Sequence, residues 1–488
     1  MKKLNEFLKY LPEHILESNI VCDHDVPLAA CDSRKVIPKT IFCAIEGAVS
    51  DGHNYINAAI ENGAETIFYT RHDIATPAGI NRIRVKDSYY AYALLSEFFF
   101  NKPASSFALH GITGTNGKTT CAFLFHKVLS ECGIKTGLLS TVEYRYGNKS
   151  IPASRTTPEA FELQNHFSGI KAAKCTAAVM EVSSHGLDQH RLGSSKFKTA
   201  IFTNLSGDHL DYHLDMERYF KAKAALFQEY LEAGSTAVIN VDDTYGERLS
   251  RMDLPAHVIT FGKNPAADCQ IKDLLSNVKG STCTLDFNGT AYNFETPLIG
   301  EYNAYNSIGV FCAAVATGLP PGKVLSVLAA EIPVPGRLES YLAPSGVSFF
   351  VDYAHTDDAL ENVLRNLKNI APARLITVFG CGGDRDSTKR PRMARAAEKY
   401  SDLVIVTSDN PRTENPQSII EDIMTGFSSR CNVLTDSDRQ AAIRLAAAKA
   451  EPGDFVVIAG KGHENYQEIN GKRHDFDDRQ IVKSIFDS

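Results

Sequence analysis

Short apolar runs recur along the chain, and each is followed by polar residues and then by a stretch with helical spacing. In the middle third, the run at 177–180 leads to Glu181, and the run at 199–202 leads to the polar segment 204–211. Apolar runs of this length, separated by helical segments, are typical of a parallel sheet with crossover helices. The pattern therefore predicts an α/β fold.

The last third of the chain repeats this pattern. The run at 375–379 leads to a loop rich in glycine, aspartate and arginine, and the run at 403–406 leads to Asp409. The run at 455–458 leads to a glycine-lysine-glycine-histidine-glutamate loop. Ligands of open α/β sheets bind beyond the carboxyl ends of the strands. Polar residues at these ends in two successive domains predict one ligand-binding cleft between the domains.

Two breaks in the pattern suggest how the 488 residues are divided. One is the polar stretch at 101–106, and the other is the proline-rich stretch at 333–337. A chain of this length predicts about three domains. We place them at 1–102, 103–333 and 334–488. The expected fold class is a small amino-terminal α/β domain, a central parallel-sheet domain with an ATPase-like phosphate loop, and a carboxy-terminal Rossmann-like α/β domain.

The glycine loop at 111–120 reads Gly-Ile-Thr-Gly-Thr-Asn-Gly-Lys-Thr-Thr. It lies between the apolar segment 107–109 and an amphipathic segment from 121 to 131, which predicts a strand, a loop and a helix. Such a loop can wrap its N–H groups around a polyphosphate, with Lys118 on the outer phosphates and the next threonine on Mg²⁺. The usual motif has glycine where Ile112 stands. A plain glycine turn before a helix is the alternative.

Composition narrows the class of protein. The formal net charge is −7 and no long Lys/Arg run occurs, so neither nucleic acid nor an anionic membrane is expected as the main partner. The eleven cysteines stand singly, which disfavours metal clusters and a disulfide framework and favours a reducing compartment. The first residues turn charged too soon for a signal peptide, and no apolar run approaches membrane-spanning length. We expect a cytoplasmic monomer that acts on small molecules without membrane insertion.

Three residues of the middle third are candidates for chemistry. Glu181 follows a buried run beside the phosphate loop, where a carboxylate suits Mg²⁺, although such a residue can also cap a helix. His209 lies in a polar loop, and its position alone is weak support for a site. Lys223 shares a helix face with Tyr219 at i, i+4. That spacing by itself favours a solvated lysine.

The ends of the last three apolar runs carry charges of both signs. Arg385 and Arg412 on neighbouring strand ends suit a carboxylate or phosphate held by two hydrogen bonds. Asp409 and Glu464 on adjacent loops suit an ammonium group. A ligand with both charges is an amino acid. Turns with salt bridges at helix starts are the alternative, and they are common.

In combination these segments resemble the Mur ligase family of peptidoglycan synthesis. The matching segments are 114–120, the stretch around Glu181, 204–211, 219–227, 300–306, 335–337 and 352–355. The sequence Asp-Asn-Pro-Arg at 409–412 resembles the motif of the members that add meso-diaminopimelate, and 460–464 agrees with it. The chain departs from the family at Tyr302, where phenylalanine is usual, and at Asp357, where proline is usual.

The resemblance implies an ATP-dependent ligase that adds meso-diaminopimelate to the D-glutamate γ-carboxylate of UDP-N-acetylmuramoyl-L-alanyl-D-glutamate through an acyl phosphate. The residues implied for ATP are Gly114, Thr115, Asn116, Gly117, Lys118, Thr119, Thr120, Asn303, Arg337, Asp352 and His355. Those implied for Mg²⁺ are Thr119, Glu181, His209 and Lys223 as a carbamate. Lys118 would act with the last three in catalysis. This role of Lys223 comes from the resemblance and opposes the solvated-lysine interpretation.

The resemblance also implies binding residues for the two other substrates. Those implied for the UDP-linked dipeptide are Cys31, Ser33, Thr156, Thr157, Ser183, Gln189 and Arg191. The stretch 32–34 and the loop at 47–52 resemble the uridine-binding part of the family. Those implied for meso-diaminopimelate are Arg385, Asp409, Asn410, Pro411, Arg412, Gly460 and Glu464.

Two other functions stay open from the sequence. A family relative that adds lysine would lack Arg412, because lysine has no second carboxylate for that residue to bind. An ATP-driven switch or motor would use the same phosphate loop but would leave the stretch 32–34 and the pair Arg385 and Arg412 without a purpose. Its ATP turnover would ignore the UDP-linked peptide.

Overall fold

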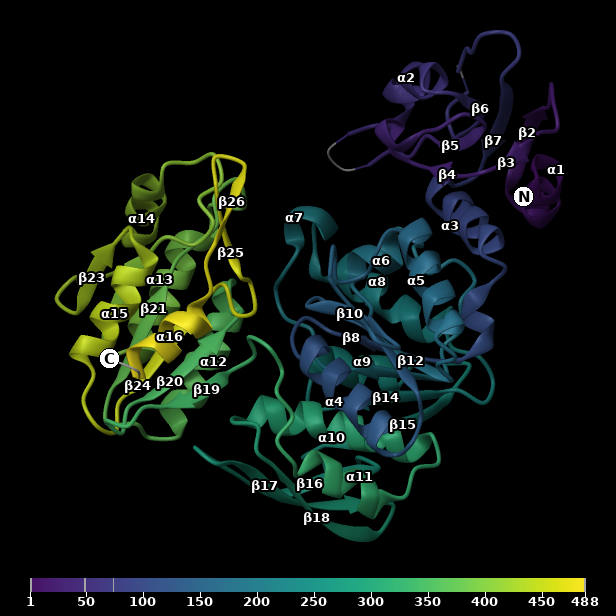
Figure 1. Ribbon diagram of the computed structural model, residues 1–488. Coiled ribbons are helices and arrows are strands. Elements are labelled where there is room, and N and C mark those ends of the chain that lie inside the picture. Colours follow the sequence, from purple (N-terminus) through teal and green to yellow (C-terminus); the bar gives the residue numbers. More distant parts are fainter. Residues whose placement is uncertain (1, 48–49, 73, 487–488) are drawn as a thin grey trace.

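The computed structural model describes residues 2–47, 50–72 and 74–486. These residues form three large sheets that follow one another along the chain, each covered by helices on both faces. In Figure 1 the carboxy-terminal unit, in yellow-green, lies to the left of the central unit, and the amino-terminal unit, in purple, lies above it. The predicted α/β architecture is confirmed. No helix of the described residues is both long and apolar enough to cross a membrane.

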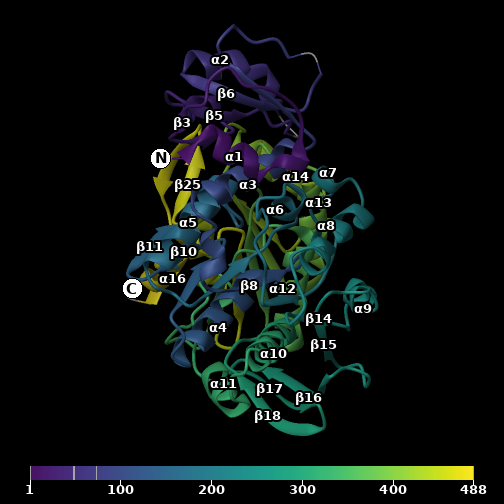
Figure 2. The same ribbon diagram turned by 90° about the vertical axis from the view of Figure 1, so that its right-hand side faces the viewer.

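The amino-terminal sheet has the strand order β2-β7-β6-β5-β4. Its strands are β2 (Ile15–Asn19), β4 (Ala29–Ala30), β5 (Thr40–Cys43), β6 (Ala64–Tyr69) and β7 (Asn81–Val85). Helices α1 (Leu4–Tyr10) and α3 (Ser88–Phe99) pack on one face and α2 (Ile56–Glu61) on the other. A short pair of β1 (Lys2–Lys3) with β3 (Asp25–Val26) lies beside α1. In Figure 2 this unit lies above the central one.

The central sheet is the largest, with the order β11-β10-β9-β12-β8-β13-β14-β15-β16-β17-β18. Its parallel strands are β8 (Ala108–Thr113), β9 (Thr136–Leu139), β12 (Ala177–Glu181), β13 (Thr199–Phe202), β14 (Thr236–Asn240) and β15 (His257–Gly262). At one edge, β10 (Glu143–Tyr146) and β11 (Lys149–Pro152) continue the sheet in antiparallel fashion. At the other edge, β16 (Cys269–Asn277) pairs parallel with β15, and β17 (Gly280–Phe287) and β18 (Thr290–Thr296) follow it antiparallel. The phosphate-loop strand β8 therefore lies between β12 and β13.

Two helical layers bury the central sheet. One layer consists of α4 (Lys118–Glu131), α10 (Glu301–Ala316) and α11 (Pro321–Leu328). The other consists of α5 (Ala160–Ala172), α6 (Ser184–Asp188), α8 (Met216–Gln228) and α9 (Thr244–Ser250), and the short α7 (Leu210–His213) precedes α8. Alternate residues of β12 point into opposite layers, since Val179 belongs to the first core and Met180 to the second. A strand buried on both faces explains why the sequence shows continuous apolar runs here.

The carboxy-terminal sheet has the order β19-β20-β24-β21-β22-β23, and only β19 is antiparallel to its neighbour. The strands are β19 (Glu339–Leu342), β20 (Ser348–Asp352), β21 (Leu375–Phe379), β22 (Leu403–Thr407), β23 (Val433–Asp436) and β24 (Phe455–Ala459). Helices α12 (Asp357–Asn369), α13 (Lys389–Tyr400) and α14 (Pro416–Met424) cover one face, and α15 (Arg439–Lys449) and α16 (Asp478–Phe486) the other. A hairpin of β25 (Tyr466–Ile469) and β26 (Lys472–Asp475) precedes α16.

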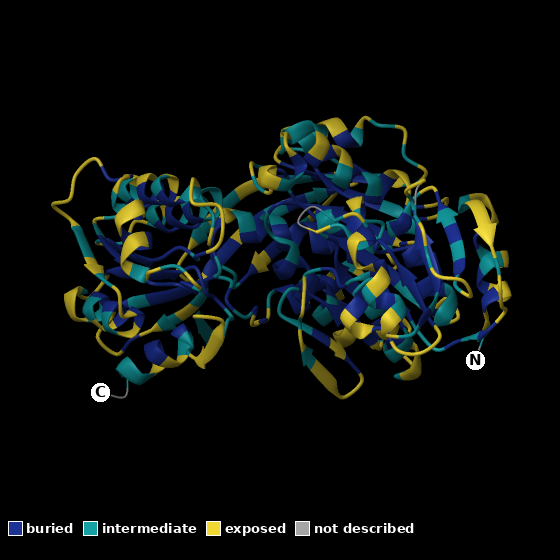
Figure 3. Cartoon of the chain, turned by 90° about the horizontal axis from the view of Figure 1, so that it is seen from above, coloured by how far each residue is buried: buried dark blue, intermediate teal, exposed yellow. Residues whose placement is uncertain are grey.

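Buried residues fill the interior of each unit, and exposed residues gather on outer helices and hairpins (Figure 3). The predicted breaks coincide with the connections between sheets, because 101–106 links α3 to β8 and 333–337 links α11 to β19. One prediction is wrong in detail. The helix after the phosphate loop starts at Lys118 rather than at 121, since Gly117 adopts φ 86° and ends the loop.

Candidate active site

The phosphate loop occupies the four residues between β8 and α4. Ile112, where glycine is usual, is a fully buried strand residue, so the loop proper begins at Gly114. A Cβ on Gly114 would lie 1.9 Å from the Thr203 hydroxyl, which explains the glycine. Asn204 holds the loop, because its backbone and side-chain oxygens accept from the N–H groups of Thr115 at 2.9 Å and of the next residue at 3.0 Å. The helix N-terminus behind the loop is a ready anion site.

Glu181 lies at the end of β12, next to the phosphate-loop strand, and is fully buried. Its carboxylate accepts a hydrogen bond from the Thr119 hydroxyl at 3.1 Å. Thr141 donates from its N–H at 2.7 Å and from its hydroxyl at 3.0 Å. The helix-capping alternative is wrong, since Ser183 caps α6 by accepting from a backbone N–H. A carboxylate and a hydroxyl side by side at a phosphate loop are hard oxygen ligands of the kind that Mg²⁺ prefers.

Lys223 lies on the inner face of α8 and has 1% of its surface exposed, so the solvated lysine expected from helix spacing is wrong. Its ammonium donates to the Gly114 carbonyl at 2.8 Å and lies 4.7 Å from the ring centroid of Tyr219. Lys118 donates to the same carbonyl at 2.9 Å. Burial, and then the charge of Lys118, hold the pKa of Lys223 well below its usual value. The lowered pKa favours the neutral, nucleophilic amine.

His209 ends the loop that leads into α7 and is exposed, with its ring nitrogen 3.4 Å from an Asp208 carboxylate oxygen. It lines the same cavity as Lys118 and Glu181. Within residues 2–47, 50–72 and 74–486, no group of three or more His, Cys, Asp or Glu side chains is arranged to hold a metal ion. A divalent cation at this site would therefore complete its shell with hydroxyl, phosphate and water oxygens, as Mg²⁺ commonly does.

A cavity of about 570 Å³ separates the central and carboxy-terminal units. The phosphate loop forms one wall, and Arg337, Asp352 and His355 stand on the other. Arg337 crosses the cleft to donate to the Thr119 hydroxyl at 3.0 Å, and its buried Nε has no hydrogen-bond partner among the described residues. Asn303, from α10, completes the lining. The cleft predicted from the strand ends is therefore present, and an unpaired guanidinium N–H in it suits an anion.

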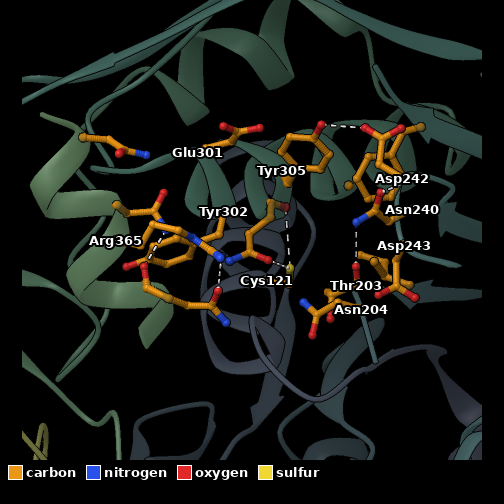
Figure 4. A pocket seen from close by; sticks show the side chains of 17 residues that line it. Cys121, Thr203, Asn204, Asn240, Asp242, Asp243, Glu301, Tyr302, Tyr305 and Arg365 are labelled. Carbon is orange, nitrogen blue, oxygen red and sulfur yellow. Dashed lines mark hydrogen bonds between the residues drawn. The ribbon is translucent and has the colours of Figure 1, made fainter. Parts of the chain in front are cut away.

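A second cavity of about 430 Å³ adjoins this cleft and shares Asn204 and Tyr302 with it. Figure 4 shows the polar side chains that surround it, with the Tyr305 hydroxyl donating to Asp242 at 2.6 Å. Asn306 also lines this cavity, and its side-chain oxygen accepts from the Cys121 thiol at 3.6 Å. The hydroxyl of Tyr302 is buried and has no partner among the described residues. Amides around aromatic rings can accept a planar, hydrogen-bonding ligand.

The predicted dipeptide residues of the central unit form one hydrogen-bonded group. Arg191 is buried and donates to the Thr157 carbonyl at 2.6 Å and to the Gln189 side chain at 2.6 and 3.0 Å. The Ser183 N–H donates to the Thr157 hydroxyl at 2.9 Å. That hydroxyl donates to the Glu181 carbonyl at 3.0 Å, so the group is continuous with the phosphate-loop site. Thr156 lines the main cavity.

The amino-terminal unit approaches this group. Burial, and then the nearby charge of Glu159, raise the pKa of Cys31 to about 11, and Glu159 is paired with Arg191 at 3.1 Å. Ser33 is buried, while the exposed Arg34 is bound by the carboxylate of Asp32. Of the predicted loop at 47–52, residues 48–49 lie outside the described residues.

The predicted amino-acid residues meet at the ends of β21, β22 and β24, which are neighbours in the sheet. Arg412 donates to the Gly383 carbonyl at 2.6 Å, in the loop that also carries the exposed Arg385. Asn410 donates to the Glu464 carboxylate at 2.9 Å. A Cβ on Gly460 would lie 2.7 Å from a carboxylate oxygen of Asp409, so this position requires glycine. Asp409 belongs to the same segment as Asn410, Pro411 and Arg412.

Three family models match successive parts of the chain: Mur ligase family, catalytic domain, at 28–98; Mur ligase middle domain, at 112–314; and Mur ligase, glutamate ligase domain, at 336–462. The chain is 43% identical to the UDP-N-acetylmuramoyl-L-alanyl-D-glutamate--2,6-diaminopimelate ligase of Geobacter metallireducens, over 93% of both chains. It is 43% identical to the ligase of that name from Aquifex aeolicus, over 93% and 92% of the two chains. The chain belongs to the Mur ligase family.

Solved structures of Mur ligases agree with this fold. A structure titled as a UDP-N-acetylmuramoyl-L-alanyl-D-glutamate--2,6-diaminopimelate ligase has a TM-score of 0.68 and 34% identity, and the match covers 99% of this chain and 98% of that one. A MurF ligase from Thermotoga maritima in complex with ADP has a TM-score of 0.58 and 18% identity, covering 89% and 94%. At that identity the second match shows the fold alone.

Sequence reasoning missed one residue at the centre of this Mur ligase's carboxy-terminal cluster. Lys461 is fully buried, with its ammonium 3.0 Å from the Asn410 side-chain oxygen, 3.1 Å from Glu464 and 3.6 Å from Asp409. The two carboxylates expected to receive a ligand ammonium therefore already face one. The sequence feature that could have indicated this role is the position of the lysine between two glycines directly after an apolar run, which places Lys461 at a strand end.

Proposed function

We propose that this Mur ligase adds meso-2,6-diaminopimelate to the D-glutamate γ-carboxylate of UDP-N-acetylmuramoyl-L-alanyl-D-glutamate, with ATP as co-substrate, in peptidoglycan synthesis. The names of relatives at 43% identity support these substrates. The observation that carries the proposal is a run of contacts from the phosphate loop to the carboxy-terminal cluster. Arg337 donates to Thr119 and lies 4.9 Å from the Tyr353 ring centroid, and that ring lies 5.0 Å from the ring of His463, two residues after Lys461.

ATP fits the cleft in this proposal. Its phosphates lie on residues 114–120 and turn Lys118 away from the loop carbonyls toward the outer oxygens. Arg337, His355 and Asp352 close over the nucleotide from the opposite wall, and Asn303 lies beside it. The amide-lined cavity of Figure 4 takes the adenine base. The His355 ring is oriented by its Nδ1, which lies 2.9 Å from the Tyr353 carbonyl oxygen.

Mg²⁺ fits the oxygen atoms at the loop, where the Thr119 hydroxyl touches the buried Glu181 carboxylate. In our proposal these two residues hold the ion, with His209 at the rim. Bound there, the ion would neutralise phosphate charge and polarise the transferring group. The charges of Lys118 and Arg337 act in the same direction, since both cations face the site where two anions must meet.

The reaction proposed has two steps. The γ-carboxylate of the dipeptide attacks the γ-phosphorus of ATP, the bond to ADP breaks, and an acyl phosphate forms. The amine of diaminopimelate then attacks the acyl carbon, phosphate leaves and the amine loses a proton. The acyl phosphate hydrolyses in water, so the carboxy-terminal unit, which carries the amino acid, excludes solvent when it closes on the cleft.

Lys223 supports this reaction as a carbamate. Its amine is buried, its pKa is lowered, and the Gly114 carbonyl is its partner at 2.8 Å. The ammonium first loses a proton. The neutral amine then attacks CO₂, an N–C bond forms and a second proton leaves, so a cation becomes an anion. The change also relieves the repulsion between Lys223 and Lys118, which lie against the same carbonyl. The new carboxylate would add an oxygen ligand near the loop.

The remaining substrates occupy the two ends of the cleft in this proposal. The UDP moiety lies on Cys31, Ser33 and the 47–52 loop, and the dipeptide reaches the Thr156–Arg191 group beside Glu181. We assign residues 1–102, 103–333 and 334–488 to the UDP, ATP and amino-acid units of a monomer in the cytoplasm.

Arg412, together with Arg385 of the loop that it contacts, is the proposed partner of the second carboxylate of diaminopimelate. The guanidinium is already aimed by its bond to the Gly383 carbonyl. Lysine lacks that carboxylate and would leave the arginine without its anion. We expect its binding free energy to be less favourable by about 2 to 4 kcal/mol. The ammonium end of the amino acid is proposed to lie among Asp409, Asn410, Pro411, Gly460 and Glu464, where it would share the two carboxylates with Lys461.

The test measures phosphate release and product mass with ATP and the UDP-linked dipeptide, adding meso-diaminopimelate, L-lysine or no amino acid. We expect release to need the dipeptide, and the tripeptide product to form with meso-diaminopimelate. Equal rates with lysine would overturn the assignment of the amino acid. ATP turnover that ignores the dipeptide would overturn the ligase function and favour an ATP-driven switch.

A further inference from the structure

A fully buried ion pair lies beneath the carboxy-terminal cluster. Arg439 is the first residue of α15 and Asp478 the first residue of α16, and neither side chain is exposed. The guanidinium donates to both oxygens of the Asp478 carboxylate, from Nε at 2.9 Å and from Nη2 at 2.8 Å. Figure 1 shows the two helices next to each other on one face of the sheet. The pair therefore joins them with the two-pronged geometry typical of arginine and carboxylate.

The same guanidinium also holds two strand ends. Nη2 donates to the Ala459 carbonyl at 2.9 Å, and Nη1 donates to the Ser408 carbonyl at 3.3 Å. Ala459 directly precedes Gly460, and Ser408 directly precedes Asp409. One side chain thus touches the residue before each of two segments that our proposed function assigns to amino-acid binding.

These two carbonyls belong to strands that are not neighbours. In the sheet, β21 lies between β22 and β24. Beyond its last residue, Gly380 packs so tightly that a Cβ there would lie 2.3 Å from the Thr407 carbonyl. Past the end of β21 a gap separates the flanking strand ends at Ser408 and Ala459. Further along, the Lys461 ammonium and the backbone bonds of Arg412 with Glu468 and Asn470 also join the two segments. Arg439 spans this gap, and a planar fork with several N–H groups can do so where the single ammonium of lysine cannot.

The position of Arg439 is unfavourable for the helix itself. A cation in the first turn of α15 opposes the helix dipole. The helix is already capped by Asp438, which accepts from the N–H groups of Gln440 and Ala441. Helix formation therefore gives no reason for an arginine here. Residues that break a local rule are most often found where a structure serves function.

We infer that Arg439, held by Asp478, is a positioning residue that sets the distance between the Asp409 and Gly460 segments and thereby the affinity for the incoming amino acid. The inference rests on the proposed function, and it deepens that function by naming the support of the amino-acid site. Arg439 belongs to none of the proposed binding sites for the three substrates, so its effect reaches the reaction only through the two strand ends.

The main test is Arg439→Lys, which keeps a cation against Asp478 but cannot bridge both carbonyls. We expect the KM for meso-diaminopimelate to rise by about tenfold or more, since small displacements of binding groups are costly. The KM values for ATP and the UDP-linked dipeptide, and the dipeptide-dependent exchange of label between ADP and ATP without amino acid, should stay within about twofold. An unchanged KM for diaminopimelate, or equal losses in all these quantities, would overturn the inference.

A matched control exists at the opposite end of the same strands. Arg374 donates to Asp454 at 2.6 and 3.0 Å and so ties the beginning of β21 to the beginning of β24. Arg374→Lys should leave the KM for diaminopimelate within about twofold, because it lies far from the strand ends that bind. A rise equal to that of Arg439→Lys would show that any loosened ion pair in this unit has the same effect, against the inference.

The double variant Arg439→Met/Asp478→Leu covers the case in which single variants fail to fold. Replacing a buried ion pair by apolar residues of similar size is often neutral for stability. We expect this variant to melt near the wild type yet to keep the raised KM for diaminopimelate. A wild-type KM in a stable double variant would overturn the inference. Failure of the proposed function is distinct, since the wild type itself would then show no diaminopimelate-dependent phosphate release.

Discussion

Lys461→Met removes a buried ammonium from between two carboxylates. The Lys461 side chain is fully buried, and those of Asp409 and Glu464 are 8% and 16% exposed, so water replaces the lost partner poorly. At the 3.1 Å separation from Glu464, and with an effective dielectric constant of about 20, the attraction alone is about 5 kcal/mol. The cost of burying the ammonium offsets part of this. Breaking a buried pair by removing one partner typically costs about 3–5 kcal/mol in the free energy of unfolding.

The chain contains no tryptophan, so intrinsic tryptophan fluorescence cannot report this loss. Hydrogen exchange read by mass spectrometry on peptides from β22 and β24 measures the free energy of opening in this unit directly. We expect it to fall by about 3 kcal/mol or more in Lys461→Met. Ligation should lose affinity for the amino acid, because Asn410 and Glu464 no longer share a fixed partner.

Lys368→Met is the matched control, since it removes a lysine from a pair in the same unit. Lys368 lies 2.6 Å from an Asp402 carboxylate oxygen, but the two side chains are 39% and 40% exposed. Exposed pairs contribute about 1 kcal/mol or less. If Lys461→Met loses no more opening free energy than Lys368→Met, then the buried ammonium does not hold the cluster together and the reasoning is refuted.

Three further results are expected. Lys223→Ala should lose activity by about a hundredfold or more and regain part of it with added formate or acetate, whereas full activity in the plain variant would contradict the carbamate. Arg412→Met should lower kcat/KM for meso-diaminopimelate by about a hundredfold with little effect on lysine, measured by ligation of each amino acid. Burial lowers the pKa of His110 from 6.5 to about 4. Between these pH values the unfolded chain binds a proton at His110 and the folded chain does not, so the free energy of unfolding decreases as pH falls from about 6.5 to 4. His110→Leu should remove up to about 3 kcal/mol of that acid loss in urea titrations at pH 7.5 and 4.5, and an unchanged difference between the two pH values would oppose this.

The strands and the phosphate loop could be predicted because each is marked by a pattern of neighbouring residues in the sequence. The continuous apolar run at 177–180 marks a strand buried on both faces, and β12 occupies it. The phosphate loop was recognisable because Gly114 and Gly117 must adopt positive φ values within a few residues. The sequence pattern puts the start of the helix three residues late, since spacing does not show where a glycine turn stops.

Burial of charged residues was beyond sequence spacing. The i, i+4 spacing of Lys223 is also that of a lysine on an exposed helix face. Lys223 is buried because α8 packs that face against the sheet. Lys461 and Arg439 likewise pair with residues far along the chain, at Asn410 and Asp478. Such pairs depend on the order of strands in a sheet, which periodicity does not encode.

The strands, the phosphate loop and the polar residues at the strand ends follow from local sequence, because each depends on residues close together in the chain. The similarity of the chain to other Mur ligases supplied the family. Tertiary structure alone decided which charged groups became neighbours: Lys223 and Lys118 on one carbonyl, Lys461 between two carboxylates, and Arg439 across the end of β21. The order of strands in the sheets and the packing of two units against each other bring these residues together. The strength of their electrostatic interactions depends on the exclusion of water from between the charged groups.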